Sequence, residues 1–158
     1  MSLTVRNVIA DDADAVIAMN AQFVKYLYDL GDPDSQTQHF TKQKYLLDGF
    51  GPEPAFAGYI AEEDGKPLGY LLYNKGYNVD LAQRLFFICD LWVGPEARRK
   101  GVARALMQRC AADCRAWGGQ WLEWYVFKPN SMAFDFYTKI GATVSDAVSI
   151  MSMRADAL

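Results

Sequence analysis

The sequence predicts an α/β fold with a mixed but mostly antiparallel central sheet flanked by helices. Three observations predict it. Apolar residues recur at helical spacing in some segments, and in alternating or continuous runs in others. Helical and strand segments interleave along the chain, which is typical of one sheet covered by helices. The length of 158 residues suits one sizeable core, so we expect residues 1–158 to form a single domain.

The composition is that of an ordinary globular protein, with 51% apolar and 22% charged residues. A formal net charge of −3 argues against a nucleic-acid partner, which would require a basic face. The longest apolar runs fall far short of a membrane span, so no membrane partner is expected. A single histidine and three cysteines without a CxxC spacing predict no metal site.

The cysteines and the first residues together favour a cytoplasmic location. Three cysteines cannot all pair within one chain, so we interpret them as reduced. Met1–Asp12 contains no apolar stretch typical of a secretory signal.

The first part of the chain is predicted as a strand followed by two helices. Asp11 and Asp12 can cap the first helix, because their carboxylates accept hydrogen bonds from free N–H groups. Gly31 and Pro33 end it. Thr41 can cap the second. The predicted segments are a strand at Leu3–Val8, a helix with apolar positions from Val16 to Leu27, and a short helix that stops at Asp48 and Gly49 after Leu47.

The middle of the chain is predicted as three strands. Ala55–Glu62 and Pro67–Asn74 are joined at Asp64-Gly65, which is a hairpin signal. Arg84–Val93 is rich in apolar residues throughout, as expected for a strand covered on both faces.

The last part of the chain alternates helix and strand. Gly118 and Gly141 are predicted to end the two helices, and Asn130 to cap the second. The predicted segments are a helix at Val102–Trp117, a strand at Trp121–Phe127, a helix at Ser131–Ile140 and a strand at Ala142–Met153.

The start of the third predicted helix carries the clearest functional pattern. A buried strand leads through a turn into this helix, whose first N–H groups and dipole favour a phosphate ligand. Gly101 would allow a close approach of the backbone. A solvated basic helix start, common on protein surfaces, is the simpler alternative. The basic residues beside it are Arg98, Arg99, Lys100 and Arg104.

Three segments together resemble a known family. Arg98–Ala103, RRKGVA, resembles the acetyl-CoA pyrophosphate loop of GNAT acetyltransferases, whose pattern is Gln/Arg-x-x-Gly-x-Gly/Ala. Asp90–Val93 resembles the family strand that pairs with the pantetheine arm. The segment 130–142, with the pattern N-x-x-A-x-x-F-Y-x-x-x-G-A, resembles the second family signature. The chain therefore resembles the GNAT superfamily over essentially its whole length.

The resemblance implies a GNAT-type N-acetyltransferase domain over residues 1–158, with acetyl-CoA as co-substrate, no metal and a homodimeric state. It also implies which residues contact the cofactor. These are Leu91, Trp92, Val93, Arg98, Arg99, Lys100, Gly101, Val102, Ala103, Arg104, Asn130 and Tyr137.

The resemblance further implies a general acid but leaves the base open. Tyr137 matches the tyrosine that protonates the leaving thiolate, although a core tyrosine on an amphipathic helix would fit the same pattern. Cys89 stands where the diamine-acetylating branch has a glutamate. Asp90 is a candidate base, but side chains alternate along a strand, so we expect it to face away from the Cys89 side. Glu123 on the neighbouring strand and an ordered water chain are the alternatives.

A narrower resemblance concerns the acceptor. Leu46–Gly51 and Phe87–Val93 are similar to segments of the diamine (spermidine/spermine-type) and thialysine acetyltransferases. Lys128 stands where that branch tends to have an acidic residue, which disfavours a polyamine and favours a smaller amine or amino acid. Aromatic and acidic residues after the first helix suit an ammonium ligand, although a polar helix end would look the same. The predicted substrate contacts are Tyr26, Tyr28, Asp29 and Cys89, with Asp32 and Asp34 nearby.

The sequence therefore predicts an N-acetyltransferase that moves an acetyl group from acetyl-CoA to a primary amine of a small molecule, such as a diamine, polyamine or lysine-like amino acid. The amine would attack directly in a ternary complex. Two alternatives stay open: a protein or peptide amine as acceptor, and an acyl-CoA-binding module without turnover.

Overall fold

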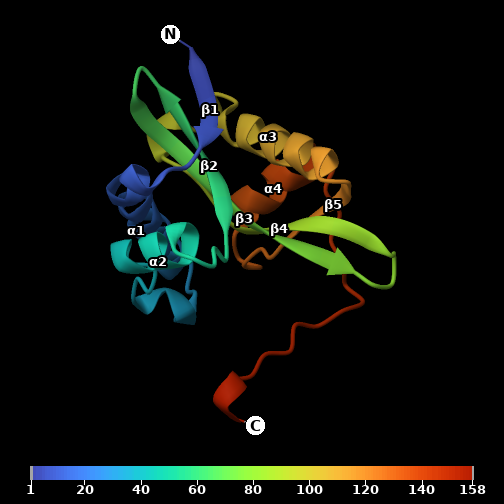
Figure 1. The fold of residues 1–158 in the computed structure, drawn as a ribbon. Helices are drawn as coiled ribbons and strands as arrows, with labels where there is room; N and C mark the ends of the chain where they lie inside the picture. Colours follow the sequence, from blue (N-terminus) through green and yellow to red (C-terminus); the bar gives the residue numbers. More distant parts are fainter. Residues whose placement is uncertain (1, 158) are drawn as a thin grey trace.

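A computed structural model describes residues 2–157. It contains a five-stranded sheet in the order β1-β2-β3-β4-β5, with helices on both faces (Figure 1). Neighbouring strands are antiparallel from β1 to β4, and β5 is parallel to β4. The predicted α/β class with a mixed, mostly antiparallel sheet is confirmed. The strands are β1 (Leu3–Asn7), β2 (Ala57–Glu63), β3 (Lys66–Asn78), β4 (Gln83–Val93) and β5 (Gly119–Trp124).

Two apolar cores lie on the two faces of the sheet. One is formed with α1 and α2, through residues such as Val16 and Tyr45 against Tyr70 and Leu72. The other is formed with α3, whose apolar side includes Leu106, and residues of α4 pack against it. The helices are α1 (Ala13–Asp29), α2 (Lys42–Phe50), α3 (Val102–Ala116) and α4 (Ser131–Lys139), and none of them, within residues 2–157, is long and apolar enough to cross a membrane.

Side-chain caps begin α2 and α4. The Thr41 hydroxyl accepts a hydrogen bond from the Lys44 N–H, and Asn130 Oδ1 accepts one from the Ala133 N–H, as the sequence predicts. Gly141 follows α4 with a φ of +101°, a conformation that favours glycine. The prediction that α2 stops at Asp48 is wrong, because the helix continues through Gly49 to Phe50. Short 3₁₀ turns lie at Ala10–Asp12, Pro33–Gln36, Pro95–Ala97 and Ala155–Ala157.

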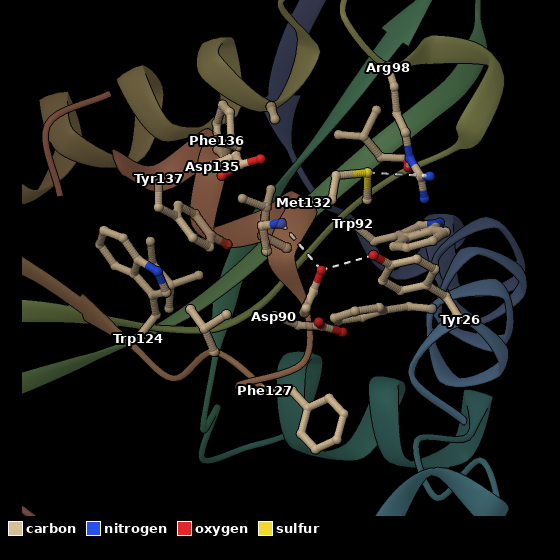
Figure 2. Close-up of a pocket in the computed structure, with 18 of the residues that line it drawn as sticks. Tyr26, Asp90, Trp92, Arg98, Trp124, Phe127, Met132, Asp135, Phe136 and Tyr137 are labelled. Carbon is tan, nitrogen blue, oxygen red and sulfur yellow. Dashed lines mark hydrogen bonds between the residues drawn. The ribbon is translucent and has the colours of Figure 1, made fainter. Parts of the chain in front are cut away.

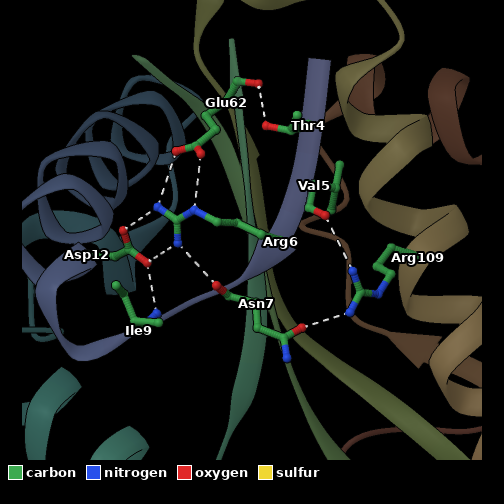
Figure 3. A network of polar contacts seen from close by, with 8 residues as sticks. All are labelled: Thr4, Val5, Arg6, Asn7, Ile9, Asp12, Glu62 and Arg109. Atoms are coloured by element: carbon green, nitrogen blue, oxygen red, sulfur yellow. Dashed lines mark hydrogen bonds and ion pairs between the residues drawn. The ribbon is translucent and has the colours of Figure 1, made fainter. Parts of the chain in front are cut away.

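Arg6 joins the first strand to the start of α1 (Figure 3). Its guanidinium donates to both carboxylate oxygens of Asp12 at 2.8 Å and also to Glu62 on β2. Asp12 Oδ2 accepts in addition from the Ile9 N–H at 2.8 Å. The carboxylate of Asp12 is thus committed to Arg6 and Ile9, and it does not cap α1 as predicted.

A bulge interrupts β4 at Cys89. Leu72 on β3 is opposite Asp90, while the next residue, Tyr73, is opposite Ile88, so Cys89 has no partner in the register. An unpaired extra residue reverses the alternation of side chains beyond it. Ile88 accordingly packs in the core under α3, whereas Asp90 bonds to residues on the α1 side.

The predicted last strand, Ala142–Met153, is wrong. Residues 142–154 have no regular secondary structure in the described chain, and Figure 1 shows this tail leaving the body of the protein. A strand requires a neighbour to take up its backbone hydrogen bonds, and no strand of residues 2–157 pairs with this segment. Its apolar side chains are exposed, with 73% of Val148 and 91% of Met151 accessible. The strand predicted at Trp121–Phe127 is also shorter, ending at Trp124.

Candidate functional site

A cavity opens where β4 and β5 separate. The last residue pair between these parallel strands is Ile88 with Trp124, yet β4 continues to Val93. The cavity has a volume of about 970 Å³, and its walls come from α1, β4, the start of α3, the segment after β5, and α4 (Figure 2). Beyond Ile88, one edge of β4 is left without a strand partner. Leu91, Trp92 and Val93, predicted as cofactor contacts, all line this part of the cavity.

The start of α3 forms one end of the cavity. Arg99 and Gly101 have φ values of +59° and +81°, which turn the chain into the helix. The first residues of α3 line the cavity, so their free N–H groups are available to an anion there. The predicted residues at this end are Arg98, Arg99, Gly101, Val102, Ala103 and Arg104; Lys100 does not line the cavity.

Arg98 is held by its own surroundings. Its Nε donates to the Val93 carbonyl at 3.2 Å, and its guanidinium carbon lies 4.7 Å from the Trp92 ring centre and 5.5 Å from that of Tyr26. Its Nη2 is buried without a hydrogen-bond partner. A buried donor without a partner is costly, so this atom fits an acceptor oxygen of a ligand. Together with the α3 amides it suits the phosphate groups of acetyl-CoA.

Tyr137 extends from α4 into the cavity, with its hydroxyl toward the interior (Figure 2). Its ring centre lies 4.8 Å from that of Trp124. Burial, and to a lesser extent the negative charge of Asp90, raise the pKa of Tyr137 well above its ordinary value. Because the phenol stays protonated at neutral pH, Tyr137 can donate a proton or a hydrogen bond.

Asp90 is the carboxylate that the structure brings to the centre of the site. Both Asp90 and Cys89 line the cavity, and the bulge at Cys89 interrupts the alternation on which the expected separation of the two side chains was based. Asp90 Oδ2 accepts hydrogen bonds from the Tyr70 hydroxyl and from Asn20 Nδ2. Burial raises the pKa of Asp90 to about 6, although these hydrogen bonds act in the opposite direction. At neutral pH this carboxylate is therefore ionised and can accept a proton.

Other predicted residues lie elsewhere. Glu123 is exposed, opposite Phe87 in the register of β5, and it does not line the cavity. Tyr28 is 56% exposed, and Asp29 pairs with Lys25 at 2.7 Å; neither lines the cavity.

The loop acids predicted beside the acceptor are used locally or exposed. Asp32 accepts from the Asp34 N–H and from the Ser35 hydroxyl, while Asp34 and Lys128 are exposed and outside the cavity.

Tyr26 and Asn130 do line the cavity, and they bond to one another. The Tyr26 hydroxyl donates to Asn130 Oδ1 at 2.9 Å, which links α1 to the start of α4 across the site (Figure 2). Asn130 therefore caps α4 and holds Tyr26 with the same oxygen.

Asn20 and Tyr70, the two donors to Asp90, were not predicted as site residues. Asn20 is 7% exposed and lies beside Met19 on the buried side of α1. A polar residue on the apolar side of a helix is the signal that could have pointed to it. Tyr70 had no such signal, since a tyrosine in an apolar strand is ordinary core. No group of three or more His, Cys, Asp or Glu side chains placed to hold a metal occurs within residues 2–157.

Comparison with known proteins gives a consistent result. A sequence model described as "Acetyltransferase (GNAT) family" matches residues 24–142. The chain is 31% identical over 90 residues to L-ornithine N5-acetyltransferase of Arabidopsis thaliana, covering 57% of this chain and 40% of that protein. It is 34% identical over 86 residues to thialysine N-epsilon-acetyltransferase of Caenorhabditis elegans, covering 54% of this chain and 53% of that protein. The chain thus spans about half the length of these curated relatives or less.

The fold has solved counterparts. An integron cassette protein from the mobile metagenome of V. cholerae superposes with a TM-score of 0.79 at 22% identity, covering 99% of this chain and 94% of that chain. At this identity the likeness concerns the fold alone.

Proposed function

Since this chain belongs to the GNAT acetyltransferase family, we propose that it transfers the acetyl group of acetyl-CoA to a primary amine of a small molecule. One observation carries the proposal. A single cavity between the separated ends of β4 and β5 has free helix amides at one end and an acid–base pair, Tyr137 and Asp90, along its wall.

Acetyl-CoA would lie along the open edge of β4, with its pyrophosphate at the start of α3. The amides of α3, the guanidinium of Arg98 and the neighbouring Arg99 and Arg104 support this placement, because they supply donors and positive charge. The cofactor brings the acetyl group as a thioester. The protein contributes position, charge and the exclusion of water.

The proposed chemistry uses two proton transfers. The amine nitrogen attacks the thioester carbonyl carbon, and the carbon–sulfur bond breaks. Asp90 takes the proton that the amine loses, and Tyr137 gives its phenolic proton to the departing sulfur. Asp90 is favoured over Glu123 as the base because it lines the cavity, whereas Glu123 is exposed outside it. Holding the amine against the thioester supplies much of the rate enhancement.

The acceptor we favour is a side-chain amine of an amino acid. The two relatives named above act, by their names, on ornithine and thialysine, which are amino acids with a terminal amine. Tyr26 and Cys89 line the cavity and are the proposed acceptor contacts. The only acidic side chains among the lining residues are Asp90 and Asp135, so there is little negative charge to hold a polyamine.

The test is CoA release from acetyl-CoA with a panel of amines: ornithine, lysine, thialysine, putrescine, spermidine and a basic peptide. We expect turnover on an amino-acid amine, and a loss of about 100-fold or more in kcat for Tyr137→Phe. Tyr77→Phe is the matched control, because Tyr77 is 60% exposed and lies outside the cavity.

Turnover on the peptide alone would replace the small-molecule acceptor with a protein amine. Binding of acetyl-CoA without turnover on any amine would support a non-catalytic acyl-CoA-binding module. No binding of acetyl-CoA at all would refute the proposal.

A homodimer in the cytoplasm is part of the same proposal. The exposed apolar tail after α4 and the free edge of β5 give a second copy a surface to cover. The three cysteines are all free thiols, which is usual in a reducing compartment.

A further inference from the structure

A chain of amide and hydroxyl groups leads from Asp90 through Asn20, which also lines the cavity, to Gln38 in the loop before α2. Gln38 Nε2 donates to Asn20 Oδ1 at 2.9 Å. Asn20 Nδ2 donates in turn to Asp90 Oδ2 at 3.1 Å and lies 3.2 Å from the Tyr70 hydroxyl. The Tyr70 hydroxyl donates to the same oxygen of Asp90. Tyr70 is 0% and Asn20 7% exposed, so water has little access to their contacts with Asp90, while Gln38 is half-buried.

Gln38 fixes which way the Asn20 amide faces. Its Nε2 is itself anchored, because it also donates to the Ile17 carbonyl at 2.9 Å. A donor held on that side requires the oxygen of Asn20 there, which turns the NH₂ group toward Asp90 and Tyr70. The loop before α2 thereby sets the orientation of a donor that acts on the catalytic carboxylate.

We propose that Asn20 and Tyr70 are positioning residues that keep Asp90 an ionised, correctly directed proton acceptor, and that Gln38 orients Asn20 for this task. The inference rests on the proposed role of Asp90 as the base. It adds three residues, from α1, β3 and the loop before α2, that do not touch the reacting atoms.

The physical argument concerns the two carboxylate oxygens separately. Both side-chain donors bond to Oδ2, and no side chain of residues 2–157 donates to Oδ1, so Oδ1 is the oxygen that would accept the substrate proton. Hydrogen bonds to the charged form oppose the effect of burial, which favours the neutral acid. Without them a larger share of Asp90 would be protonated near neutral pH, and less of it could act as a base.

Apart from Asn20 and Tyr70, the Leu91 backbone N–H also stabilises the Asp90 anion, and no charged side chain of the described residues does so. The titratable groups that face it are Tyr70 on β3, Tyr137 on α4 and Cys89 on β4, and all three are neutral acids whose ionisation its charge disfavours. The facing residue from α1, Asn20, is uncharged, and β5 contributes no acidic or basic side chain to the cavity lining. The anion therefore depends on neutral donors.

The test follows the titration of Asp90 directly, by carboxyl ¹³C NMR of the aspartate-labelled 17.8 kDa protein, with Asp90→Asn to assign its resonance. We expect the midpoint in Tyr70→Phe to rise by about one pH unit, the size expected for one hydrogen bond to a charged group. Asn20→Leu should raise it similarly, and Gln38→Leu by less. The acid limb of kcat/KM should move with the midpoint, while KM for acetyl-CoA stays unchanged.

Tyr59→Phe is the matched control. Tyr59 is 1% exposed and donates to Asp113 at 2.8 Å, in the core on the other face of the sheet. Its loss should lower stability as Tyr70→Phe does, but leave the Asp90 midpoint in place. An unchanged midpoint in Tyr70→Phe and Asn20→Leu, or an equal shift in Tyr59→Phe, would overturn the inference. The titration needs no amine, so absence of turnover would count against the proposed function and not against this result.

Discussion

Burial raises the pKa of both Asp90 and Tyr137, yet it leaves one ionised at neutral pH and the other protonated. For Asp90 the rise brings the pKa to about 6, close to a working pH, which makes the carboxylate a better proton acceptor than an ordinary aspartate. For Tyr137 the rise keeps the phenol protonated. The same dry cavity thus favours a base and an acid in neighbouring positions.

The first prediction concerns the pH dependence that follows from Asp90. Its pKa is raised to about 6 and the ionised form is the active one, so kcat/KM should be constant above that pH and fall as pH drops through it. Asp90→Asn should lower kcat by about 10²- to 10⁴-fold and abolish this acid limb. A pH–rate profile of both proteins measures it. An intact acid limb in Asp90→Asn would assign the base elsewhere.

The second prediction concerns stability at the start of the chain. Arg6→Leu leaves the Asp12 carboxylate, whose side chain is 10% exposed, without its main partner, and should lower the free energy of unfolding by about 1 to 3 kcal/mol at neutral pH. The Arg6 guanidinium lowers the pKa of Asp12. The contribution of the Arg6–Asp12 pair to the free energy of unfolding is therefore complete above the ordinary aspartate pKa of about 3.9. It declines as pH falls below that value.

Urea unfolding of the wild type and Arg6→Leu at several pH values measures this. The difference in the free energy of unfolding between the two proteins should shrink as pH falls below the ordinary pKa of aspartate. Arg154→Leu, which removes an exposed ion pair with Asp156, is the control and should leave the midpoint unchanged. Equal stability of Arg6→Leu and wild type at neutral pH would contradict the prediction.

At the scale of elements, local signals were sufficient wherever a boundary depends on local chemistry. Thr41, Asn130 and Gly141 occupy the helix ends that the sequence predicts for them, because a cap is made within four residues. The end of β5 and the fate of Ala142–Met153 depend on which strand lies beside them. That information is tertiary, and apolar patterning alone does not contain it.

The residues of the candidate site likewise differ in whether the local sequence is enough to predict them. The segment 98–104 is a contiguous motif that can be predicted from its residues, and all of them except Lys100 line the cavity. The face on which Asp90 lies cannot be predicted from alternation along β4 alone, because a bulge is defined by the partner strand and not by the bulged one. Asn20 and Tyr70 lie 50 residues apart in the sequence, and only folding brings them together at one carboxylate.

The third prediction tests the turn into α3. Gly101 has a φ of +81°, and a Cβ there would meet no other atom, so Gly101→Ala changes the backbone preference alone. We expect a loss of about 1 kcal/mol in stability and a rise in KM for acetyl-CoA. Gly31→Ala is matched, since Gly31 has a φ of +91° and equal open space but lies outside the cavity. It should lose stability without a change in KM; equal KM changes in both variants would contradict the role of the turn.

At the scale of the whole molecule, the tail after α4 is the feature least compatible with a free monomer. Val148 and Ile150 are 73% and 64% exposed. Three other apolar residues of the tail are at least 63% exposed: Val144, Met151 and Met153. Exposed apolar residues concentrated in one segment favour association.

The fourth prediction follows from this tail. The double variant Val148→Asp with Ile150→Asp should convert a dimer to a monomer, because burying two carboxylates in an interface is strongly unfavourable. Sedimentation velocity of the variant and the wild type measures it. Leu47→Asp, on α2 and 55% exposed, is the control and should stay dimeric. A wild-type protein that sediments as a monomer would contradict the proposed dimer.

The extra residue at Cys89 has a consequence for how this strand can vary. Before the bulge, Phe86 and Ile88 pack in the α3 core. After it the alternation is shifted by one residue, so that Val93 packs in that core and Trp92 in the core with α1 and α2.

Deleting Cys89 would make Ile88 and Asp90 consecutive, so Asp90 would stay on the α1 side. Inserting one residue into β3 opposite Cys89, between Leu72 and Tyr73, would instead restore unbroken alternation along β4 and turn the carboxylate toward the α3 core, away from Asn20 and Tyr70. Substitutions at Cys89 are far milder, since its side chain is exposed. The length of β3 relative to β4 thus decides which face carries the carboxylate, and an insertion between Leu72 and Tyr73 should disturb the site more than a replacement of Cys89.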